Sequence, residues 1–371
     1  MKRRAFLRRA AAGTILSPWI VGRGAPSATV EPLRVGVLTQ ENGPHLSAYL
    51  RSLAQIDGIE SIGLSDESGT TFASARDALG AKVTTFRDHD RMLREFRPRA
   101  AVISLAAHKA PPVIRKTLEA GCHILAEKPS CTRAEDFEPL VRLAETRKLT
   151  LTLAFYLRAN PGAVKARELV RSGFIGKPYA AHLLVVADQT RLTRPAFHRS
   201  WLASRDTAGG GNLIWLGIHY VDLLQHLTQD RIERVSAMTR NVGGQPIDVE
   251  DAVGVTFQSR KGMVGTYHGG YYLDRGYHLG LTLWGSKGWL RFDEDNSPLE
   301  WYSTHPDAPK GVQSFPFAYE VGPYHGIVEA VLDAARGTGP PPATGEECLH
   351  VLKSIFSAYE AARTGRAQDV L

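Results

Sequence analysis

The sequence predicts an α/β protein with an N-terminal Rossmann-like parallel sheet and a C-terminal α+β domain whose sheet is mostly antiparallel. Two observations support this fold class. Short apolar runs alternate with helical segments from residue 33 to about 150, as in parallel sheets built from right-handed crossovers. From residue 179 onward, longer runs alternate polar and apolar positions, which is typical of antiparallel strands with one covered face. A length of 371 residues allows two domains, each with its own core.

Strand and helix signals alternate regularly in the first half. Leu46, Leu50 and Leu53 share one helical face, and Gly121 provides a helix stop. The expected strands are Leu33–Leu38, Ser61–Leu64, Lys82–Thr85, Ala100–Leu105 and Cys122–Ala126. The expected helices are Leu46–Ile56, Ala73–Leu79, Arg91–Phe96, Pro112–Ala120 and Arg133–Thr146. These units predict a dinucleotide-binding domain over residues 33–150.

A substrate domain is expected over residues 151–371. After the apolar run Leu151–Phe155, a helix over Ala163–Ser172 ends at Gly173. The expected strands are Tyr179–Ala187, Arg234–Arg240, Ala252–Gln258, Val264–Tyr272, Leu279–Trp284 and Gly288–Asp293. Two helices follow, Tyr324–Ala335 and Gly345–Thr364, separated by a proline-rich turn at residues 339–342.

The positive charge of the chain is concentrated at its N-terminus. The formal net charge is +7, but residues 1–28 hold six cations and no acid. Removing these six of the 45 cations leaves 39 against 38 acids, so nucleic acid is not the expected partner. Arg3 and Arg4 open a twin-arginine pattern, followed by an apolar region and small residues. We therefore expect a signal peptide over residues 1–28, export by the twin-arginine machinery, and a periplasmic or secreted protein without a stable membrane span.

A charged pair follows one of the buried-looking strands. Glu127 and Lys128 come directly after Cys122–Ala126 and are followed by Pro129. In open α/β sheets, ligands bind at the carboxyl ends of the strands. A lysine there can hydrogen-bond a substrate hydroxyl or share its proton if neighbours lower its pKa. The alternative is an ordinary surface ion pair that opens a loop.

The second chemical stretch begins at three glycines, residues 209–211, and continues as a helix to about residue 227. Asn212, Trp215, His219 and Asp222 are spaced by three or four residues, so they share one helical face. A histidine on that face is a natural proton acceptor for a hydroxyl group. A histidine bonded within the fold is the alternative. No set of Cys and His residues has metal-ligand spacing, so no metal site is expected.

These motifs together resemble the Gfo/Idh/MocA family. The resemblance rests on Glu-Lys-Pro at 127–129, the glycine triplet leading to Gly-x-His-x-x-Asp at 217–222, and the connecting motifs at 157–161 and 172–176. It implies a nicotinamide-dinucleotide domain, a substrate domain, and hydride transfer at a carbinol carbon of a sugar or cyclitol. It also implies that Lys128 contacts substrate and cofactor and that His219 is the acid/base.

The expected site follows from these positions. The catalytic residues are Lys128 and His219. The residues expected to bind NAD, or NADP, are Thr39, Asn42, Gly43, Asp66, His108, Glu127, Lys128 and Arg158. The residues expected to bind substrate are Lys128, Asn212, Trp215, His219 and His198.

Three positions depart from the family pattern. The glycine-rich turn reads Thr39-Gln40-Glu41-Asn42-Gly43-Pro44, so Thr39 and Glu41 replace two glycines that permit close approach to a pyrophosphate. Leu105-Ala106-Ala107 replaces a Thr-Pro segment, and Trp215 replaces an acid four residues before His219. An indole can stack on a sugar ring but cannot accept a proton.

The sequence therefore supports one leading function and two alternatives. The leading function is an exported oxidoreductase that acts on a sugar or polyol with a tightly held nicotinamide cofactor. The first alternative is a redox-neutral lyase, epimerase or glycosidase-like enzyme with reduced or lost NAD binding. The second is a non-catalytic carbohydrate-binding protein on a degenerate dinucleotide fold. A homo-oligomer is expected, formed through the open face of the second sheet.

Overall fold

Six parallel strands form the first sheet of this protein, in a computed structural model that describes residues 31–293 and 297–371. The strand order is β3-β2-β1-β4-β5-β6. The strands are β1 Leu33–Thr39, β2 Ile59–Ser65, β3 Val83–Phe86, β4 Ala100–Ser104, β5 His123–Ala126 and β6 Leu151–Leu153. All of their pairings are parallel, as the alternating sequence pattern predicts. The expected signal peptide lies outside the described residues.

Helices connect the strands of this sheet. They are α1 Leu46–Gln55, α2 Phe72–Leu79, the short η1 Gly80–Lys82, α3 His89–Phe96, α4 Ala110–Glu119 and α5 Ala134–Arg147. The central strands are buried on both faces, and Val35, Val37 and Ile62 have no exposed surface. β1, β4 and β5 end at Thr39, Ser104 and Ala126, so the segments that follow them meet at one edge of the sheet.

The second sheet has nine strands in the order β14-β13-β12-β11-β7-β10-β9-β8-β15. Its strands are β7 Pro178–Asp188, β8 Ile232–Arg240, β9 Ala252–Ser259, β10 Val264–Leu273, β11 His278–Gly285, β12 Gly288–Phe292, β13 Leu299–Ser303, β14 Gln313–Phe315 and β15 Gln368–Asp369. Among the described strands of this sheet, only β7 and β10 pair in parallel; the other neighbours are antiparallel. The expected fold class is confirmed.

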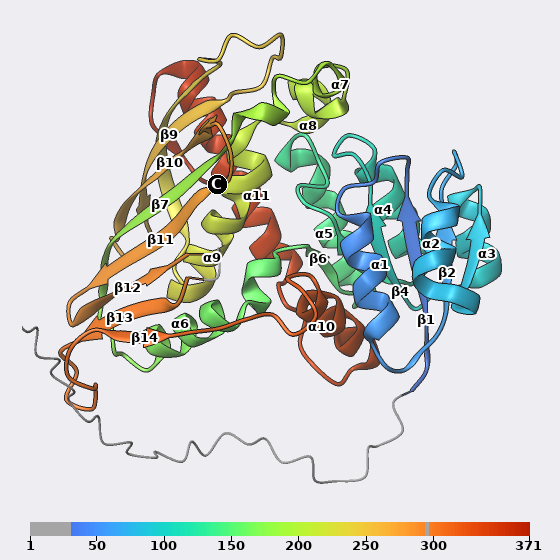
Figure 1. The fold of residues 1–371 in the computed structure, drawn as a ribbon, viewed down its shortest axis with the longest axis horizontal. Coiled ribbons are helices and arrows are strands. Elements are labelled where there is room, and N and C mark those ends of the chain that lie inside the picture. Colours follow the sequence, from blue (N-terminus) through green and yellow to red (C-terminus); the bar gives the residue numbers. More distant parts are fainter. Residues whose placement is uncertain (1–30, 294–296) are drawn as a thin grey trace, which may run out of the picture. The chain divides into compact units, whose positions relative to one another are not determined.

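One face of the second sheet is covered by helices, and the other is open (Figure 1). The helical segments that follow β6 are η2 Tyr156–Ala159, α6 Pro161–Arg171, η3 Gln189–Arg191, α7 Pro195–His198, η4 Trp201–Ala203, α8 Arg205–Ala208, η5 Leu213–Gly217, α9 Ile218–Thr228, α10 His325–Arg336 and α11 Gly345–Thr364. α11 packs on β8 and also on α5, and α10 packs on α1 and β5. The last helices therefore return to the first sheet and join the two layers in one hydrophobic core.

The structure differs from the expected elements in three places. The run after residue 150 pairs with β5 as β6, because its backbone continues the parallel register of the first sheet. The expected helix after Asn212 begins with the π-helical turn η5. β13, β14 and β15 were not expected from the sequence. Within residues 31–293 and 297–371, no helix is long and apolar enough to cross a membrane.

Candidate active site

Lys128 is buried at the carboxyl edge of the first sheet. The Glu127 amide donates to the Ile103 carbonyl on β4 at 2.8 Å, which fixes the backbone where β5 ends. Only 2% of Lys128 is exposed. Its Nζ donates to the Trp215 carbonyl oxygen at 2.6 Å and lies 4.1 Å from the centroid of the Trp215 ring. Burial lowers the pKa of Lys128 to about 8, although the charge of Glu127 opposes this effect.

His219 lies in the first turn of α9, directly after η5. Only 4% of His219 is exposed, and its Nδ1 is buried without a hydrogen-bond partner among the described residues. Burial lowers the pKa of His219 well below its ordinary value, and the neighbouring Lys128 and His45 lower it further. The ring is therefore a neutral imidazole that can accept a hydrogen bond from a ligand.

Two cavities share Lys128. The first has a volume of ≈ 300 Å³ and contains His219; its other lining residues are His45, Lys128, Tyr156, Val185, Leu216, Tyr220, Tyr277, Leu279, Pro323 and Tyr324. The second has a volume of ≈ 210 Å³, and its lining residues are Asn42, Pro44, His45, Lys128, Arg191, Leu192, Phe197, Trp201, Leu202, Gly211, Trp215, Leu216, Val249 and Tyr271. We call them the His219 cavity and the Trp215 cavity. The structure thus brings both expected catalytic residues to one cavity.

His45 is a site residue that the sequence analysis missed. It lines both cavities and occupies the position before the first residue of α1, where its backbone is left-handed, φ 56°, and its side chain makes no capping hydrogen bond. Its Nδ1 lies 3.0 Å from Glu127 Oε2, which also accepts a 2.5 Å hydrogen bond from the Tyr49 hydroxyl. A histidine placed directly after the turn that follows the first strand was the available sequence signal.

The Glu127 carboxylate binds two side chains of the protein, His45 and Tyr49. It is 1% exposed, and its Oε1 has no hydrogen-bond partner among the described residues. Burial alone raises the pKa of a carboxyl group, but the attraction and hydrogen bond of His45, with the charge of Lys128, lower the pKa of Glu127 below its ordinary value. Glu127 is therefore a buried carboxylate that holds His45.

Aromatic rings connect His45 to His219 along the cavity wall. His45 stacks on Tyr324 with ring centroids 5.1 Å apart, and Tyr324 stacks on Tyr156 at 5.0 Å. Tyr156 then meets His219 edge-on at 4.6 Å. These four rings come from four separate segments of the chain, so their mutual packing fixes the shape of the His219 cavity.

The turn after β1 can accept an anion despite its lost glycines. Glu41 and Asn42 are exposed at its tip, and the first turn of α1 has no side-chain cap. Uncapped helix amides attract phosphate groups. A Cβ at Gly43 would lie 2.2 Å from Thr39 Oγ1, so this glycine allows close packing inside the turn. The Trp215 cavity runs from Asn42 to Lys128, and these residues fit the nicotinamide end of a dinucleotide.

Asp66 is committed to its own loop. Its carboxylate accepts hydrogen bonds from the amide and hydroxyl of Ser68, from the amide and hydroxyl of Thr71, and from the hydroxyl of Thr70. Only 1% of the residue is exposed. Burial raises the pKa of a carboxyl group, but the bonds from Ser68 and Thr71 lower the pKa of Asp66. A carboxylate has about four lone-pair positions, so none is left for a ribose hydroxyl.

Arg158 forms a buried ion pair instead of lining either cavity. Its guanidinium contacts Asp222 at 2.6 Å, donates to the Pro342 carbonyl at 3.0 Å and lies 3.4 Å from Glu347. Burial opposes the charge, but the carboxylate of Asp222 raises the pKa of Arg158. The pair ties η2 to α9 and α11.

The remaining expected residues do not line the two cavities. Asn212 is fully buried; its amide nitrogen donates to the Val185 carbonyl, and its oxygen accepts from the Tyr267 hydroxyl. His108 is exposed, with its ring against the Thr207 carbonyl. The ring of His198 contacts the Leu192 carbonyl. Thr39 donates to the Ser104 carbonyl.

Glu250 is a second residue that the sequence analysis missed. It is 3% exposed and accepts hydrogen bonds from the amides of Gly211 and Leu213 and from the Tyr359 hydroxyl. A Cβ at Gly211 would lie 1.9 Å from the Glu250 carbonyl oxygen. The triple glycine therefore allows the segment before His219 to pack against Glu250 and Tyr359. Burial raises the pKa of Glu250 despite these donors.

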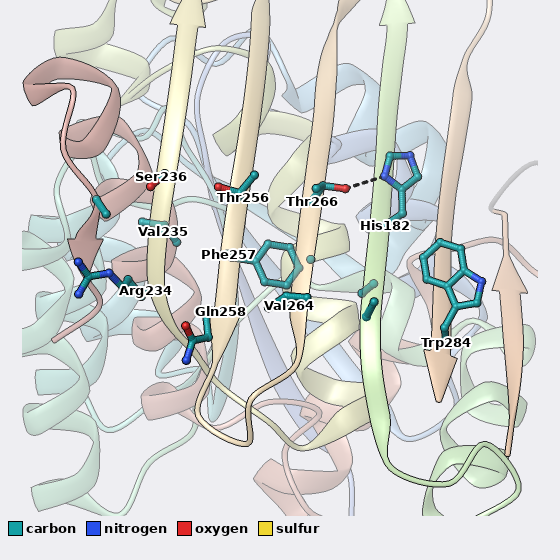
Figure 2. A pocket seen from close by; sticks show the side chains of 14 residues that line it. His182, Arg234, Val235, Ser236, Thr256, Phe257, Gln258, Val264, Thr266 and Trp284 are labelled. Atoms are coloured by element: carbon teal, nitrogen blue, oxygen red, sulfur yellow. Dashed lines mark hydrogen bonds between the residues drawn. The ribbon is translucent and has the colours of Figure 1, made fainter. Parts of the chain in front are cut away.

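A larger cavity, ≈ 650 Å³, lies on the open face of the second sheet (Figure 2). Phe257, Trp284 and His182 line it, and His182 bonds to the Thr266 hydroxyl at 2.9 Å. None of the expected site residues borders this cavity. Within the part of the chain that the structure describes, no cluster of three or more His, Cys, Asp or Glu side chains could hold a metal ion.

Both halves of the chain match models of known families. Residues 36–155 match an oxidoreductase family with an NAD-binding Rossmann fold, and residues 163–291 match the GFO/IDH/MocA C-terminal domain. The chain is 28% identical over 258 residues to a 1,5-anhydro-D-fructose reductase from Ensifer adhaerens, covering 68% of this chain and 74% of that protein. It is 27% identical over 347 residues to dTDP-3,4-didehydro-2,6-dideoxy-alpha-D-glucose 3-reductase from Saccharopolyspora spinosa, covering 90% and 99%.

A solved structure has the same fold. The WlbA dehydrogenase from Bordetella pertussis, in complex with NADH and UDP-GlcNAcA, superimposes with a TM-score of 0.80 at 22% identity, covering 92% of this chain and 98% of that one. The order of the two matched segments agrees with the order of the two sheets. The chain belongs to the Gfo/Idh/MocA family of oxidoreductases, whose N-terminal half is an NAD-binding Rossmann fold.

Proposed function

We propose that this protein is an exported oxidoreductase that transfers hydride between a tightly held nicotinamide cofactor and a carbinol carbon of a sugar or polyol. The observation that carries the proposal is the meeting of Lys128 and His219 in one ≈ 300 Å³ cavity. One is a buried ammonium with a lowered pKa, and the other is a buried neutral imidazole. This pair can donate to and accept from the same hydroxyl group.

The chain has residues suited to two parts of the cofactor, its phosphates and its nicotinamide ring. Asn42 and the uncapped start of α1 would face the phosphates, and Lys128 with Trp215 would face the nicotinamide ring. When bound, the nicotinamide supplies the acceptor or donor of the hydride. The Asp66 carboxylate is bonded to Ser68 and Thr71 of its own loop, so it does not select between NAD and NADP.

Lys128 would hold the reacting oxygen. Its ammonium has three N–H donors, of which one is bonded to the Trp215 carbonyl. The remaining donors can bind the hydroxyl oxygen and stabilise negative charge that develops there during oxidation. The neutral imidazole of His219, which lines the same cavity, would accept the hydrogen bond of that hydroxyl at a ring nitrogen, so the two groups orient the C–H bond that breaks.

The walls of the His219 cavity suit a carbohydrate. Tyr156, Tyr277 and Tyr324 combine ring faces with hydroxyl groups, and Leu279 adds apolar surface from β11. Such walls can pack on the C–H face of a sugar ring while polar groups bind its hydroxyls. A volume of ≈ 300 Å³ is at the lower end of ligand pockets, which fits a ligand of about monosaccharide size. The names of the two curated relatives are consistent with a carbohydrate substrate.

The expected export of the protein is the reason to propose a cofactor that stays bound. The N-terminal residues 1–28 carry the twin-arginine pattern. An exported enzyme has no access to the cytosolic pool of dinucleotides, so a cofactor that is retained and recycled within the site suits this location. A fusion of residues 1–28 to a reporter that is active only outside the cytosol tests export. Replacing Arg3 and Arg4 with lysine should abolish the signal, and continued export of that variant would contradict the twin-arginine route.

A second copy of the chain would cover the open face of the second sheet. That face exposes Val264 and Trp284, which are 56% and 43% exposed, beside the ≈ 650 Å³ cavity (Figure 2). Exposed apolar patches of this kind mark interaction sites. The test is the molar mass in solution of the wild-type protein and of a W284E variant. We expect an oligomer that W284E weakens; a wild-type monomer would contradict the proposal.

Cofactor retention and carbinol oxidation test the central proposal. The purified protein is denatured to release bound NAD(H) or NADP(H), and the emptied protein is then titrated with each. It is next assayed, in both directions, with 1,5-anhydro-D-fructose, hexoses, cyclitols and methyl glycosides. We expect bound dinucleotide and turnover of at least one carbinol or ketose. Absence of dinucleotide binding at millimolar concentration would contradict the oxidoreductase function.

A further inference from the structure

The imidazoles of His45 and His219 both line the His219 cavity. Their surroundings differ, which indicates different roles in proton transfer. His219 is 4% exposed, and the Lys128 ammonium and His45 are its neighbours in the cavity. The side chain of His45 is 40% exposed, and its Nδ1 contacts the buried carboxylate of Glu127 at 3.0 Å. Both rings line the cavity where a substrate hydroxyl would lie.

The proton of the hydroxyl cannot stay on His219. An imidazolium there would be a buried cation close to the Lys128 ammonium, and burying a charge without an opposite partner is costly. Lys128 already carries its full complement of protons when charged. A site that oxidises a carbinol therefore needs a further group that takes the proton and passes it to water.

His45 has the features of such a group. The Glu127 carboxylate binds Nδ1, so Nδ1 carries the ring hydrogen and Nε2 is the nitrogen that can accept a proton. A charged His45 would have Glu127 as its counter-ion. The exposed part of its side chain lets the proton continue to solvent. A nitrogen base oriented by a buried carboxylate is the arrangement that proton-transferring enzymes use.

We propose that His45, held by Glu127, is the proton-exchanging residue of this site, taking up the hydroxyl proton that passes through the Lys128–His219 pair and releasing it to solvent. The proposal rests on the carbinol oxidation proposed above. In that reaction the carbon gives up a hydride, with two electrons, to the oxidised nicotinamide, and the oxygen gives up a proton. The proton goes to His45 Nε2 and then to water; reduction runs the same steps in reverse.

The groups that surround His45 agree with this role. Glu127 faces it from the end of β5, and the Tyr49 hydroxyl from α1 binds the same carboxylate oxygen. Tyr324, just before α10, stacks on its ring. Lys128 and His219 share the cavity with it. Glu127 is thus the only anionic side chain that the described contacts place against His45.

Chemical rescue separates proton exchange from a structural role. His45 has a left-handed backbone, φ 56°, which glycine adopts without strain, so H45G keeps the turn and leaves space for a free imidazole. We expect kcat of H45G to fall about a hundredfold, the usual contribution of a positioned acid or base. Imidazole buffer should restore it in proportion to its concentration, while the Kd for NADH stays within threefold of wild type.

Two further variants serve as controls. H45N tolerates the same backbone and can still bond to Glu127, but it cannot exchange a proton at this position; it should lose activity like H45G and gain nothing from imidazole. H305A removes a histidine that stacks on Phe174, away from the two cavities. It should keep wild-type activity in the presence and absence of imidazole.

A measurement without substrate checks the same assignment. Nitrogen chemical shifts of the histidine rings report which nitrogen carries the hydrogen. We expect the Nδ1–H form for His45 in the wild-type protein, and loss of that preference in E127Q, whose amide can donate to Nδ1. The Nε2–H form in the wild-type protein would overturn the proposal, because Nε2 could not then accept a proton.

The outcomes distinguish this inference from the proposed function. A wild-type protein that oxidises a carbinol while H45G keeps kcat within threefold overturns the role of His45 alone. An H45G variant that loses activity and is not rescued by imidazole also overturns it, since His45 would then act by shape. A wild-type protein that binds NADH but turns over no carbinol overturns the proposed function, and the inference with it.

Discussion

The ammonium of Lys128 lies 4.1 Å from the centroid of the Trp215 ring and donates a 2.6 Å hydrogen bond to the Trp215 carbonyl oxygen. One residue thus holds the ammonium through both its ring and its backbone. The carbonyl is available at this place because Trp215 lies in the π-helical turn η5, which interrupts the regular α-helical hydrogen-bond pattern. Neither contact supplies a full negative charge, so the burial of Lys128 still lowers its pKa to about 8.

Removal of the Lys128 charge should separate activity from stability. We expect K128M to abolish turnover while its unfolding free energy at pH 7 is equal to or greater than that of wild type, because a buried ammonium with a pKa of about 8 costs about 3 kcal/mol. The unfolded chain binds this proton up to about pH 10. Wild-type stability should therefore rise with pH between about 8 and 10.

Urea unfolding at several pH values measures this effect. K128M should lack the rise above pH 8. K177M, which removes an exposed lysine directly before β7, should keep it. Wild-type turnover by K128M would contradict the assignment of Lys128 to the reaction.

Replacement of Trp215 should move the alkaline limit of activity. W215L removes a cation–π contact worth about 1–2 kcal/mol but keeps the backbone carbonyl that binds Lys128. Without the ring, the charged ammonium is less stabilised, so the pKa of Lys128 should fall below about 8. Because the charged form binds the reacting oxygen in the proposed reaction, the fall in kcat/KM at high pH should begin at a lower pH.

W215F is the matched variant because it retains an aromatic face. Its pH profile should lie between those of wild type and W215L. Equal profiles for all three proteins would mean that the ring does not act on Lys128, and that Trp215 contributes through its packing against Trp201, whose ring centroid is 5.0 Å away.

The fold was predictable because local patterns determine it. The meeting of Lys128 and His219 in one cavity was predictable because these residues lie at a strand end and a helix start. Alternating apolar runs gave the parallel sheet, and Glu-Lys-Pro marked the end of β5. The contacts of His45 and Glu250 were not predictable, since each depends on a partner that is distant in the chain. The π-helical turn η5 was not predictable either. Regular helical spacing puts Asn212 and His219 on one face, but in the structure Asn212 bonds to Tyr267 and does not line the cavity.

Loss of the Asp66 carboxylate should affect stability more than cofactor binding. In D66N, the amide group that replaces one oxygen cannot accept from Ser68 or Thr71. We expect a loss of about 2 kcal/mol in unfolding free energy and a Kd for NADH within threefold of wild type. Because the pKa of Asp66 is lowered in the fold, its contribution is present above about pH 4 and is lost as the pH falls through its folded value.

The binding half of this prediction is measured by NADH fluorescence on folded D66N. S68A removes a single donor to the same carboxylate and should cost less stability. A tenfold loss of NADH affinity in D66N, at unchanged affinity in S68A, would contradict this prediction and show that Asp66 binds the ribose of the cofactor.

Disruption of the Arg158–Asp222 pair should destabilise the protein without changing its affinity for cofactor. Asp222 is fully buried, and the side chain of Arg158 is 5% exposed. D222A removes the buried counter-ion of the guanidinium and leaves it only the more exposed Glu347, 3.4 Å away; loss of one partner of a buried ion pair costs about 3–5 kcal/mol. The double variant R158M/D222L replaces both charges with apolar groups and should recover part of the loss.

Guanidinium unfolding gives the coupling between the two positions, and NADH titration of R158M gives the cofactor affinity. An R158M variant that keeps its unfolding free energy but binds NADH at least tenfold more weakly would contradict a purely structural pair and assign Arg158 to the cofactor.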